Sequence, residues 1–227
     1  MTPSERACSV TPRRLPRRPR RALAHLREMD AQMAEVIGRC GPFRLGEHPP
    51  GYLALCWAII GQQLSMIAAG RITARFTELV ERRGGPDPAA VLRVPERELR
   101  ACGLSGAKAA AVRRLAGFWI EERLDSSRLA ALPDEELLRL LTVVKGVGPW
   151  TVKMFLIFSL RRPDVLPVED LGLRAGFREI YGTPNGDMPS PEVIEARAEA
   201  WRPYRTVGTW YCWRHLEWMK EQKNGGT

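Results

Sequence analysis

Apolar residues recur at helical spacing along most of this chain, and nowhere do they alternate with the period of two that a half-buried strand requires. Between residues 22 and 38, for example, they fall mostly three or four positions apart. Prolines such as Pro88 and Pro133 stand where further helices would begin, at positions where the missing N–H costs nothing. The pattern predicts an all-α chain of about ten short helices between residues 22 and 227.

Size and composition narrow the class of protein. The 227 residues suit one large domain or two small lobes, and 44% hydrophobic with 27% charged residues is ordinary for a globular chain. Apolar runs such as residues 154–160 are far too short to span a bilayer, and no signal-peptide pattern follows the first arginines. Five cysteines without a C-x-x-C pair argue against disulfides or a four-thiolate metal site. We therefore expect a cytoplasmic protein with reduced thiols and no membrane partner.

The positive charge is concentrated at one end of the chain. Of the net charge of +9, residues 1–21 carry +6, because they hold seven arginines and one acidic residue. Their four prolines oppose a helix, so we expect a basic, flexible tail ahead of a domain at residues 22–227. Such a tail could bind DNA phosphates, or it could be a disordered leader. A mitochondrial presequence is disfavoured, since the prolines would break its amphipathic helix.

The most informative segment is KGVGPWT at residues 145–151, which separates predicted helices at 133–143 and 149–160. Gly146 and Gly148 permit a tight turn with left-handed backbone, and Val147 between them can lock the two helices together. The N–H groups of such a helix-hairpin-helix, with the dipole of its second helix, would bind a phosphate without reading a base. On its own, the triplet would not favour this over an ordinary αα-hairpin with a glycine cap.

A carboxylate follows the hairpin. Asp170 comes after a proline-led segment and directly before an apolar helix start at Leu171. An aspartate in this position would cap the helix, and the cap would fix its orientation. An oriented carboxylate is also the group that stabilises an oxocarbenium-like sugar. The two roles, helix cap and catalytic residue, are compatible.

A helix-hairpin-helix followed by a Gly/Pro-rich loop and an aspartate resembles the signature of the HhH-GPD DNA glycosylase superfamily, and within it the 3-methyladenine DNA glycosylase II (AlkA-type) branch. Three further segments resemble that branch: IIGQQLS at 59–65, GLSGAKA at 103–109 and WRPYRT at 201–206. The resemblance covers residues 22–220 and implies a two-lobed helical fold with a cleft between the lobes. It also implies a hairpin at 133–160 that contacts DNA through Gly146, Val147, Gly148 and Thr151. A monovalent cation would bind the hairpin backbone near Gly146 and Gly148, and no side-chain metal site is expected.

Two positions indicate which chemistry of the family to expect. Lyase-competent relatives carry a lysine just after the hairpin glycines, whereas this chain carries Trp150; Lys145 and Lys153 are near but not at that position. The resemblance therefore implies a monofunctional hydrolase, in which Asp170 assists an attacking water and no AP-lyase step follows. Because only Cys212 lies beyond residue 102, the iron–sulfur cluster of some relatives is excluded by count, and we expect no cofactor.

The resemblance also places Trp150, Met154 and Trp213 in a pocket for a flipped base. A purine alkylated at N3 or N7 is cationic, so it leaves readily and binds electron-rich ring faces by stacking and cation–π attraction. Met154 stands where a relative has an aromatic residue, which leaves the width of the pocket open. Core packing is the alternative for any tryptophan, and we expect it for three others. These are Trp57, Trp119 and Trp210.

Two features of the family pattern are missing. Only residues 1–51 precede the first helix of the barrel type, so we expect no N-terminal β-rich domain. A relative fills the gap left by the flipped base with a bulky aliphatic residue, but Gly106 stands at the aligned place and cannot act as a wedge. Leu104, Gln62 or Gln63 is the candidate instead, unless Leu104 is buried and the glutamines bond to backbone.

The leading hypothesis is a monomeric DNA glycosylase. It would flip an alkylated purine, of the 3-methyladenine or 7-methylguanine type, out of double-stranded DNA and hydrolyse its N-glycosidic bond, the first step of base excision repair. One alternative is a glycosylase of the same fold for uracil or for oxidised or deaminated bases. Another is a non-catalytic helix-hairpin-helix module, which would have no need for Asp170. A histidine metal site is not supported, because His25, His48 and His215 lack ligand spacing.

Overall fold

The computed structural model describes residues 14–224, and within that range the regular elements are all helices. The prediction of an all-α fold is therefore confirmed for the described residues. The helices are α1 (Arg20–Met29), α2 (Ala31–Cys40), α3 (Gly51–Gly61), α4 (Met66–Arg82), α5 (Pro88–Arg93), α6 (Glu96–Ala101), α7 (Gly106–Glu121), α8 (Ser126–Ala131), α9 (Asp134–Thr142), α10 (Pro149–Phe158), α11 (Leu171–Tyr181), the 3-10 helix η1 (Pro184–Gly186), α12 (Pro191–Ala198), the 3-10 helix η2 (Glu199–Trp201) and α13 (Arg205–Asn224).

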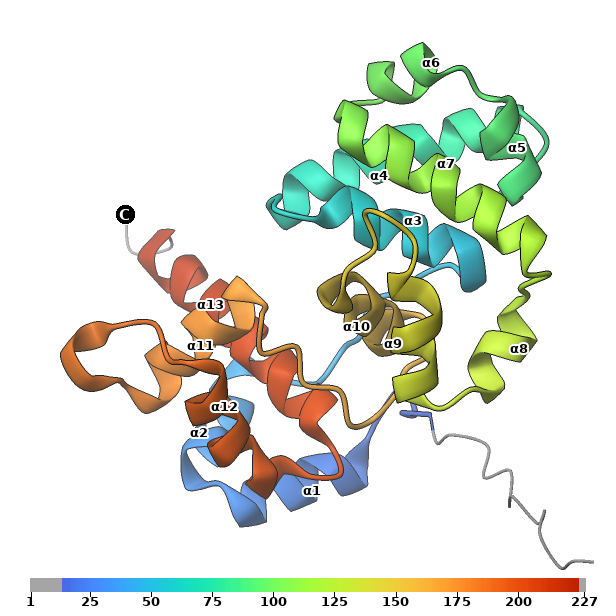
Figure 1. The fold of residues 1–227 in the computed structure, drawn as a ribbon. Coiled ribbons are helices and arrows are strands. Elements are labelled where there is room, and N and C mark those ends of the chain that lie inside the picture. The colour runs from blue at the N-terminus through green and yellow to red at the C-terminus, as the bar shows by residue number, and fades with distance from the viewer. Residues whose placement is uncertain (1–13, 225–227) are drawn as a thin grey trace, which may run out of the picture.

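The helices form two lobes, as Figure 1 shows. In one lobe α3 packs against α4, α7 and α10, while α5 and α6 pack against α7. In the other, α13 packs against α11 and α2, and α1 packs against α2 and η2. The second lobe thus combines the first two helices with the last three, and the chain between them builds the first lobe. The two-lobed architecture expected from the sequence is present.

The connector between α2 and α3 joins the lobes and packs against both. Tyr211 of α13 donates its hydroxyl hydrogen to the carbonyl of Gly41 at 3.0 Å, at the start of the connector. At its end, Ser159 donates to the carbonyl of Pro49 at 3.2 Å, just after α10. The connector is thereby fixed between α13 and α10, the two helices that supply the pocket residues.

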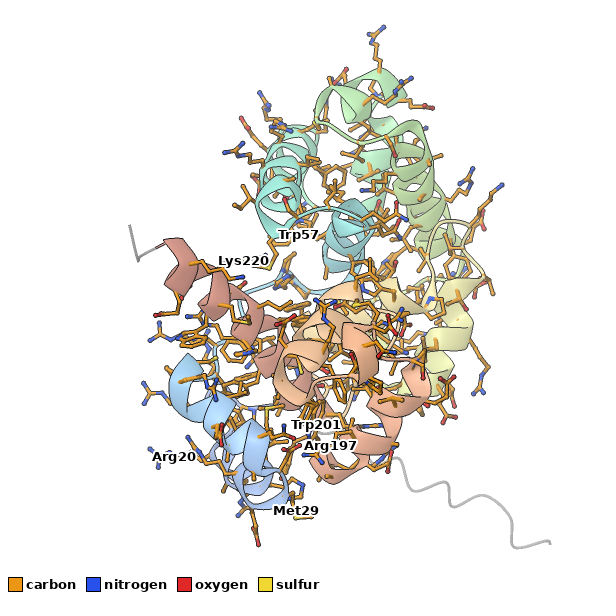
Figure 2. All side chains as sticks on the ribbon, turned by 90° about the vertical axis from the view of Figure 1, so that its left-hand side faces the viewer. Arg20, Met29, Trp57, Arg197, Trp201 and Lys220 are labelled. Atoms are coloured by element: carbon orange, nitrogen blue, oxygen red, sulfur yellow. The ribbon has the colours of Figure 1, made fainter. Side chains whose placement is uncertain are left out.

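The single helix expected at residues 22–38 is wrong, because the chain breaks at Asp30. This residue has extended backbone, φ −146° and ψ 103°, and its side chain caps α2 by accepting from the N–H of Met33 at 3.0 Å. Its carboxylate is buried and also accepts from Tyr181 at 2.8 Å, Trp201 at 3.0 Å and Arg197 at 3.1 Å. Figure 2 shows Arg197 and Trp201 side by side at this point. The break thus ties α2 to α11, α12 and η2.

The boundary predicted at residue 21 lies too far along the chain. Leu15 is buried, and its N–H donates to the carbonyl of Arg161 at 2.7 Å. Arg14 donates to the carbonyl of Leu160 at 3.1 Å, and α1 begins at Arg20. Residues 14–21 therefore belong to the folded domain, held there by main-chain pairing that the arginine and proline content did not reveal. The rest of the predicted tail, residues 1–13, lies outside the described residues.

Two further expectations concern membranes and thiols. Between residues 14 and 224, none of the helices combines the length and apolar character needed to cross a bilayer. Cys40, Cys56, Cys102 and Cys212 are buried and free, as expected. Burial raises the pKa of the Cys56 thiol to about 12, so this side chain is uncharged and unreactive at neutral pH.

Candidate active site

The hairpin predicted at residues 133–160 is formed by α9 and α10, joined by the turn at residues 143–148. Val147 is buried, with 4% of its surface exposed, as expected for a residue in the joint. Gly146 has a φ of 104°, and a Cβ there would lie 2.5 Å from the Cβ of Ala111 on α7. Gly148 has a φ of −100°, which any residue adopts. The expectation of left-handed backbone is therefore confirmed at Gly146 and wrong at Gly148.

The N-terminus of α10 offers hydrogen-bond donors to a ligand. Its N-cap is Gly148, which has no side chain to accept a hydrogen bond from the first turn. The N–H groups of that turn also have no acceptor within the helix. These donors and the positive end of the helix dipole suit a phosphate. Lys145 is exposed in the same turn, and Arg114 of α7 donates to its carbonyl at 3.4 Å. Two positive side chains thus flank the donors.

A second loop, residues 62–65 between α3 and α4, is bonded to this turn. Nε2 of Gln62 donates to the carbonyl of Gly146 at 3.0 Å and to Oγ1 of Thr151 at 2.8 Å. Thr151 is only 1% exposed, so its side chain holds Gln62 instead of facing DNA. The Gly146 carbonyl, one of those expected to hold a cation, already accepts this bond. Among residues 14–224, no three histidine, cysteine, aspartate or glutamate side chains group as metal ligands.

Asp170 lies at the N-terminus of α11, where it is the N-cap. Oδ1 accepts from the N–H of Leu173 at 2.6 Å and from Nε1 of Trp213 at 2.8 Å. Oδ2 accepts from Nε1 of Trp150 at 2.8 Å. Asp170 is half-buried, so the carboxylate is fixed by three donors and still reaches solvent. The structure thereby brings together three residues that lie far apart in sequence, on α10, α11 and α13.

Gly172 makes this arrangement possible. A Cβ at this position would lie 3.1 Å from Oδ1 of Asp170 and 3.1 Å from Cδ1 of Trp213. Such contacts are closer than nearly all real Cβ contacts, so a side chain at Gly172 would displace the indole or the carboxylate. The absence of a side chain lets Trp213 approach Asp170. Because both tryptophans direct their N–H edges at the carboxylate, their ring faces remain for stacking.

A row of rings that the sequence did not predict continues from Trp213. The rings of Trp213 and Phe158 are nearly parallel, at 12°, with centroids 5.7 Å apart. Phe158 stacks on His48 at 4.6 Å, and His48 meets Trp57 edge-on at 5.6 Å. Burial lowers the pKa of His48, so its ring is uncharged at neutral pH. The signal for Phe158 was its spacing of four and eight residues from Met154 and Trp150 on α10.

The remaining predicted pocket and core residues divide as follows. Met154 is 7% exposed and belongs to the hydrophobic core, so it presents little surface to a ligand. Trp119 is buried against Tyr52, and Trp210 packs on Phe43, as the core assignment predicted. Trp57 is half-buried and belongs to the row of rings.

Comparison with known proteins identifies the family. Residues 56–203, which span the hairpin and Asp170, match the model of the HhH-GPD superfamily of base excision DNA repair proteins. The chain is a member of this superfamily. It is 33% identical to DNA-3-methyladenine glycosylase 1 of Schizosaccharomyces pombe over 198 aligned residues. The alignment covers 86% of this chain and 86% of that protein.

Solved structures of superfamily members agree with the fold. The 3-methyladenine DNA glycosylase of S. pombe, in complex with abasic DNA, superimposes with a TM-score of 0.79 at 33% identity, over 86% of this chain and 95% of the other. A DNA-3-methyladenine glycosidase from Bacillus halodurans gives 0.72 at 32% identity, over 88% and 91%. The two-lobed fold seen here is thus the glycosylase fold of the superfamily.

The three wedge candidates of this glycosylase chain lie in different environments. Leu104 is 4% exposed and part of the core, so the expectation that it contacts DNA is wrong. Gln62 is engaged by the hairpin. Gln63 is exposed at the tip of the loop and has left-handed backbone with a φ of 55°. Gln63 is therefore the candidate whose side chain is free to enter a duplex.

Proposed function

We propose that this chain is a monofunctional alkylpurine DNA glycosylase. It binds double-stranded DNA through the hairpin, flips a damaged nucleotide into the pocket and hydrolyses its N-glycosidic bond. The observation that carries the proposal is the carboxylate of Asp170, fixed by the indole N–H groups of Trp150 and Trp213 at the N-terminus of α11. The names of the relatives in S. pombe and B. halodurans support the alkylated-base specificity.

Asp170 supplies the electrostatic part of the reaction. As the base departs, positive charge develops on the deoxyribose, and a fixed carboxylate stabilises that charge without reorganising. Oδ1 accepts two of the described hydrogen bonds and Oδ2 accepts one, from Trp150. Oδ2 thus keeps a lone pair that faces the sugar or orients the attacking water. The bond to the base nitrogen breaks, and the neutral alkylated base leaves with the bonding electrons. The water adds to the anomeric carbon and gives up one proton to the Asp170 carboxylate, which passes it to solvent.

The pocket selects a cationic base. The faces of Trp150 and Trp213 stack on the flipped base, with Phe158 packed behind Trp213, and each cation–π contact contributes roughly 0.5–2 kcal/mol. The uncharged ring of His48 adds aromatic surface without repelling the cation. A base that already carries positive charge is a good leaving group, so the site needs no acid to protonate it.

We expect no lyase reaction, because the position of the lyase lysine carries no amine in this chain. Trp150 occupies the position of the lyase lysine, and its N–H is bonded to Asp170. Lys153, one turn later, donates to Glu169 at 2.9 Å, so its ammonium is engaged in a salt bridge. The product is an intact abasic site, and borohydride traps no covalent protein–DNA adduct. We further propose that the protein acts as a monomer in the cytoplasm without an iron–sulfur cluster, with a monovalent cation on the hairpin backbone as its only ion.

Release of free base from duplex DNA carrying one lesion tests this function. N3-methyladenine, N7-methylguanine, ethenoadenine, hypoxanthine and uracil are compared under single-turnover conditions. We expect the two cationic methylpurines to be released fastest. Preferential release of uracil or hypoxanthine would assign the chain to another specificity within the superfamily. Binding without release of any base would make it a non-catalytic DNA-binding module.

A further inference from the structure

Lys108 bonds to the end of α3 and to the loop at residues 62–65, and that loop is in turn bonded to the hairpin through the side chain of Gln62. Lys108 is in the first turn of α7, where its own N–H is capped by Oγ of Ser105 at 3.3 Å. Its ammonium donates to the carbonyl of Ile60 at 2.8 Å and to the carbonyl of Gln62 at 2.8 Å. Between residues 14 and 224 it forms no salt bridge, so its partners are these main-chain oxygens.

The position of this charge follows from the helix ends that meet here. The last carbonyls of α3 lack N–H donors within the helix, and a cation is favourable at that negative end. The same charge lies in the first turn of α7, whose positive end disfavours it. Burial also lowers the pKa of the Lys108 ammonium. Two main-chain carbonyls stabilise the ammonium against these unfavourable effects, and the same two bonds fix the start of the loop.

The contact of Lys108 is continued by Gln62. The carbonyl of Gln62 accepts from Lys108, and its side-chain amide donates to Gly146 and Thr151. One residue therefore bonds to α7 through its backbone and to the hairpin through its side chain. The next residue, Gln63, has left-handed backbone and projects at the tip. Its direction is set by the residue before it, because no hydrogen bond of its own side chain fixes it among the described residues.

The surface around this tip is apolar and uncovered. Leu64 is 38% exposed, Met66 75% and Ile67 72%, all within four residues of Gln63. Consecutive large apolar side chains exposed to water indicate a surface that a partner covers. Because Gln62 bonds to the hairpin turn, this surface lies beside the phosphate-binding donors. A duplex bound by the hairpin would cover it.

We propose that Lys108 is a positioning residue, whose ammonium holds the loop at residues 62–65 against the hairpin so that Gln63 enters the duplex as the damaged base flips out. This inference rests on the proposed glycosylase function. Lys108 touches neither the base nor the sugar, and it acts on flipping, not on bond cleavage. Loss of its contacts leaves Asp170 and its two tryptophans in place.

The test compares two substrates that differ in the cost of flipping. In one, the alkylated base is paired; in the other, it lies opposite an abasic site, where unstacking is easier. Lys108→Met keeps the length of the side chain but removes its donors. We expect single-turnover release to fall about ten- to a hundredfold on the paired duplex and less than about threefold opposite the abasic site. Lys108→Arg, which retains donors, should restore most of the activity on the paired duplex.

A matched control lies on the same helix. Arg113 of α7 also donates to carbonyls at the end of a helix, those of Leu92 at 3.2 Å and Val94 at 2.7 Å, but this helix is α5 and not part of the hairpin. Arg113→Met should change release from the two substrates by the same factor. The fluorescence of 2-aminopurine placed beside the lesion reports flipping directly, and it should rise less with Lys108→Met than with the wild type.

The possible failures can be told apart. If the wild type releases no base from either substrate, the proposed function is wrong. If the wild type is active and Lys108→Met loses the same factor on both substrates, or keeps full activity and a normal 2-aminopurine signal on the paired duplex, the positioning role is overturned.

Discussion

Trp150 and Asp170 are joined by a hydrogen bond of 2.8 Å from the indole Nε1 to the carboxylate Oδ2. In the proposed mechanism, the residue at the position of the lyase lysine thus orients the carboxylate of Asp170. In the proposed function, this pair links base recognition by the indole face to charge stabilisation by the carboxylate. Trp213 bonds to the other oxygen in the same way.

Replacing either tryptophan by phenylalanine separates these two roles. Trp150→Phe keeps a ring but loses one hydrogen bond to a carboxylate, a contact worth about 1.5–3 kcal/mol. We expect the single-turnover rate of base release to fall about ten- to a hundredfold while the affinity for damaged DNA changes little. Trp210→Phe, on the same helix as Trp213 but packed on Phe43, is the control. Equal losses of rate in the Trp150 and Trp210 variants would contradict an orienting role.

The two hairpin glycines should respond differently to alanine. At Gly146 an added Cβ meets Ala111 and the φ of 104° becomes strained, whereas at Gly148 there is open space and an ordinary φ. Gly146→Ala should lower the affinity for damaged and undamaged duplex alike, as measured by fluorescence anisotropy, and Gly148→Ala should have a smaller effect. Loss of affinity for damaged DNA alone would argue against backbone binding of phosphates.

Asp30 should make the stability of the fold depend on pH. Burial by itself would raise the pKa of Asp30, but hydrogen bonds from Trp201, Met33, Tyr181 and Arg197 outweigh it and hold that pKa below its usual value. A carboxyl group with a lowered folded-state pKa contributes stability above its unfolded pKa and loses it as the pH falls towards the folded one.

The melting temperature of the wild type should therefore fall as the pH drops below about 4. Asp30→Asn removes the buried charge that accepts from Arg197, Tyr181 and Trp201, and it should destabilise the protein by about 1–3 kcal/mol at neutral pH. The melting curves of the wild type and the variant should converge in acid. A constant difference across the whole pH range would show that the carboxylate charge is not responsible.

If the N-terminal arginines bind DNA, the contacts should come from residues 1–13, which precede the segment that packs on the folded domain. Arg14 and Leu15 bind at the C-terminal end of α10, while the hairpin lies at its N-terminus, about 15 Å away along a ten-residue helix. If residues 1–13 contact phosphates, their deletion should reduce the slope of log affinity against log salt by about one unit per lost contact. An unchanged slope would leave this segment without a role in binding.

The sequence predicted the parts of the site that depend on local rules. The hairpin followed from Gly146 and Pro149, and the helix cap at Asp170 from its place before an apolar helix start. The hydrogen bonds from Trp150 and Trp213 to Asp170 depend on how α10, α11 and α13 pack, which no local pattern reports. The burial of Leu104 and the bonds of Gln62 are of the same kind.

The break at Asp30 shows where the periodicity was misleading. The apolar spacing continues without interruption from α1 into α2, and both helices bury residues of it, Leu26 in α1 and Met33 and Val36 in α2. The helix nevertheless ends at Asp30, because the buried carboxylate accepts hydrogen bonds from Tyr181, Arg197 and Trp201, which lie far along the chain. An aspartate three residues before an apolar position was the available signal for the cap.

The most direct test of the account is the single-turnover rate of base release by Asp170→Asn. Asparagine keeps the shape and caps α11 nearly as well, so stability should be unchanged within about 1 kcal/mol. Asp125→Asn, at the cap of α8, controls for the loss of a capping charge, since Asp125 bonds only to Ser127 and Arg128.

Because the lost charge stabilises the transition state far more than the ground state, release of N3-methyladenine by Asp170→Asn should fall at least about a hundredfold, while damaged DNA is still bound. Asp125→Asn should release the base at the wild-type rate. Near-normal release by Asp170→Asn would contradict the central claim that this carboxylate carries the chemistry.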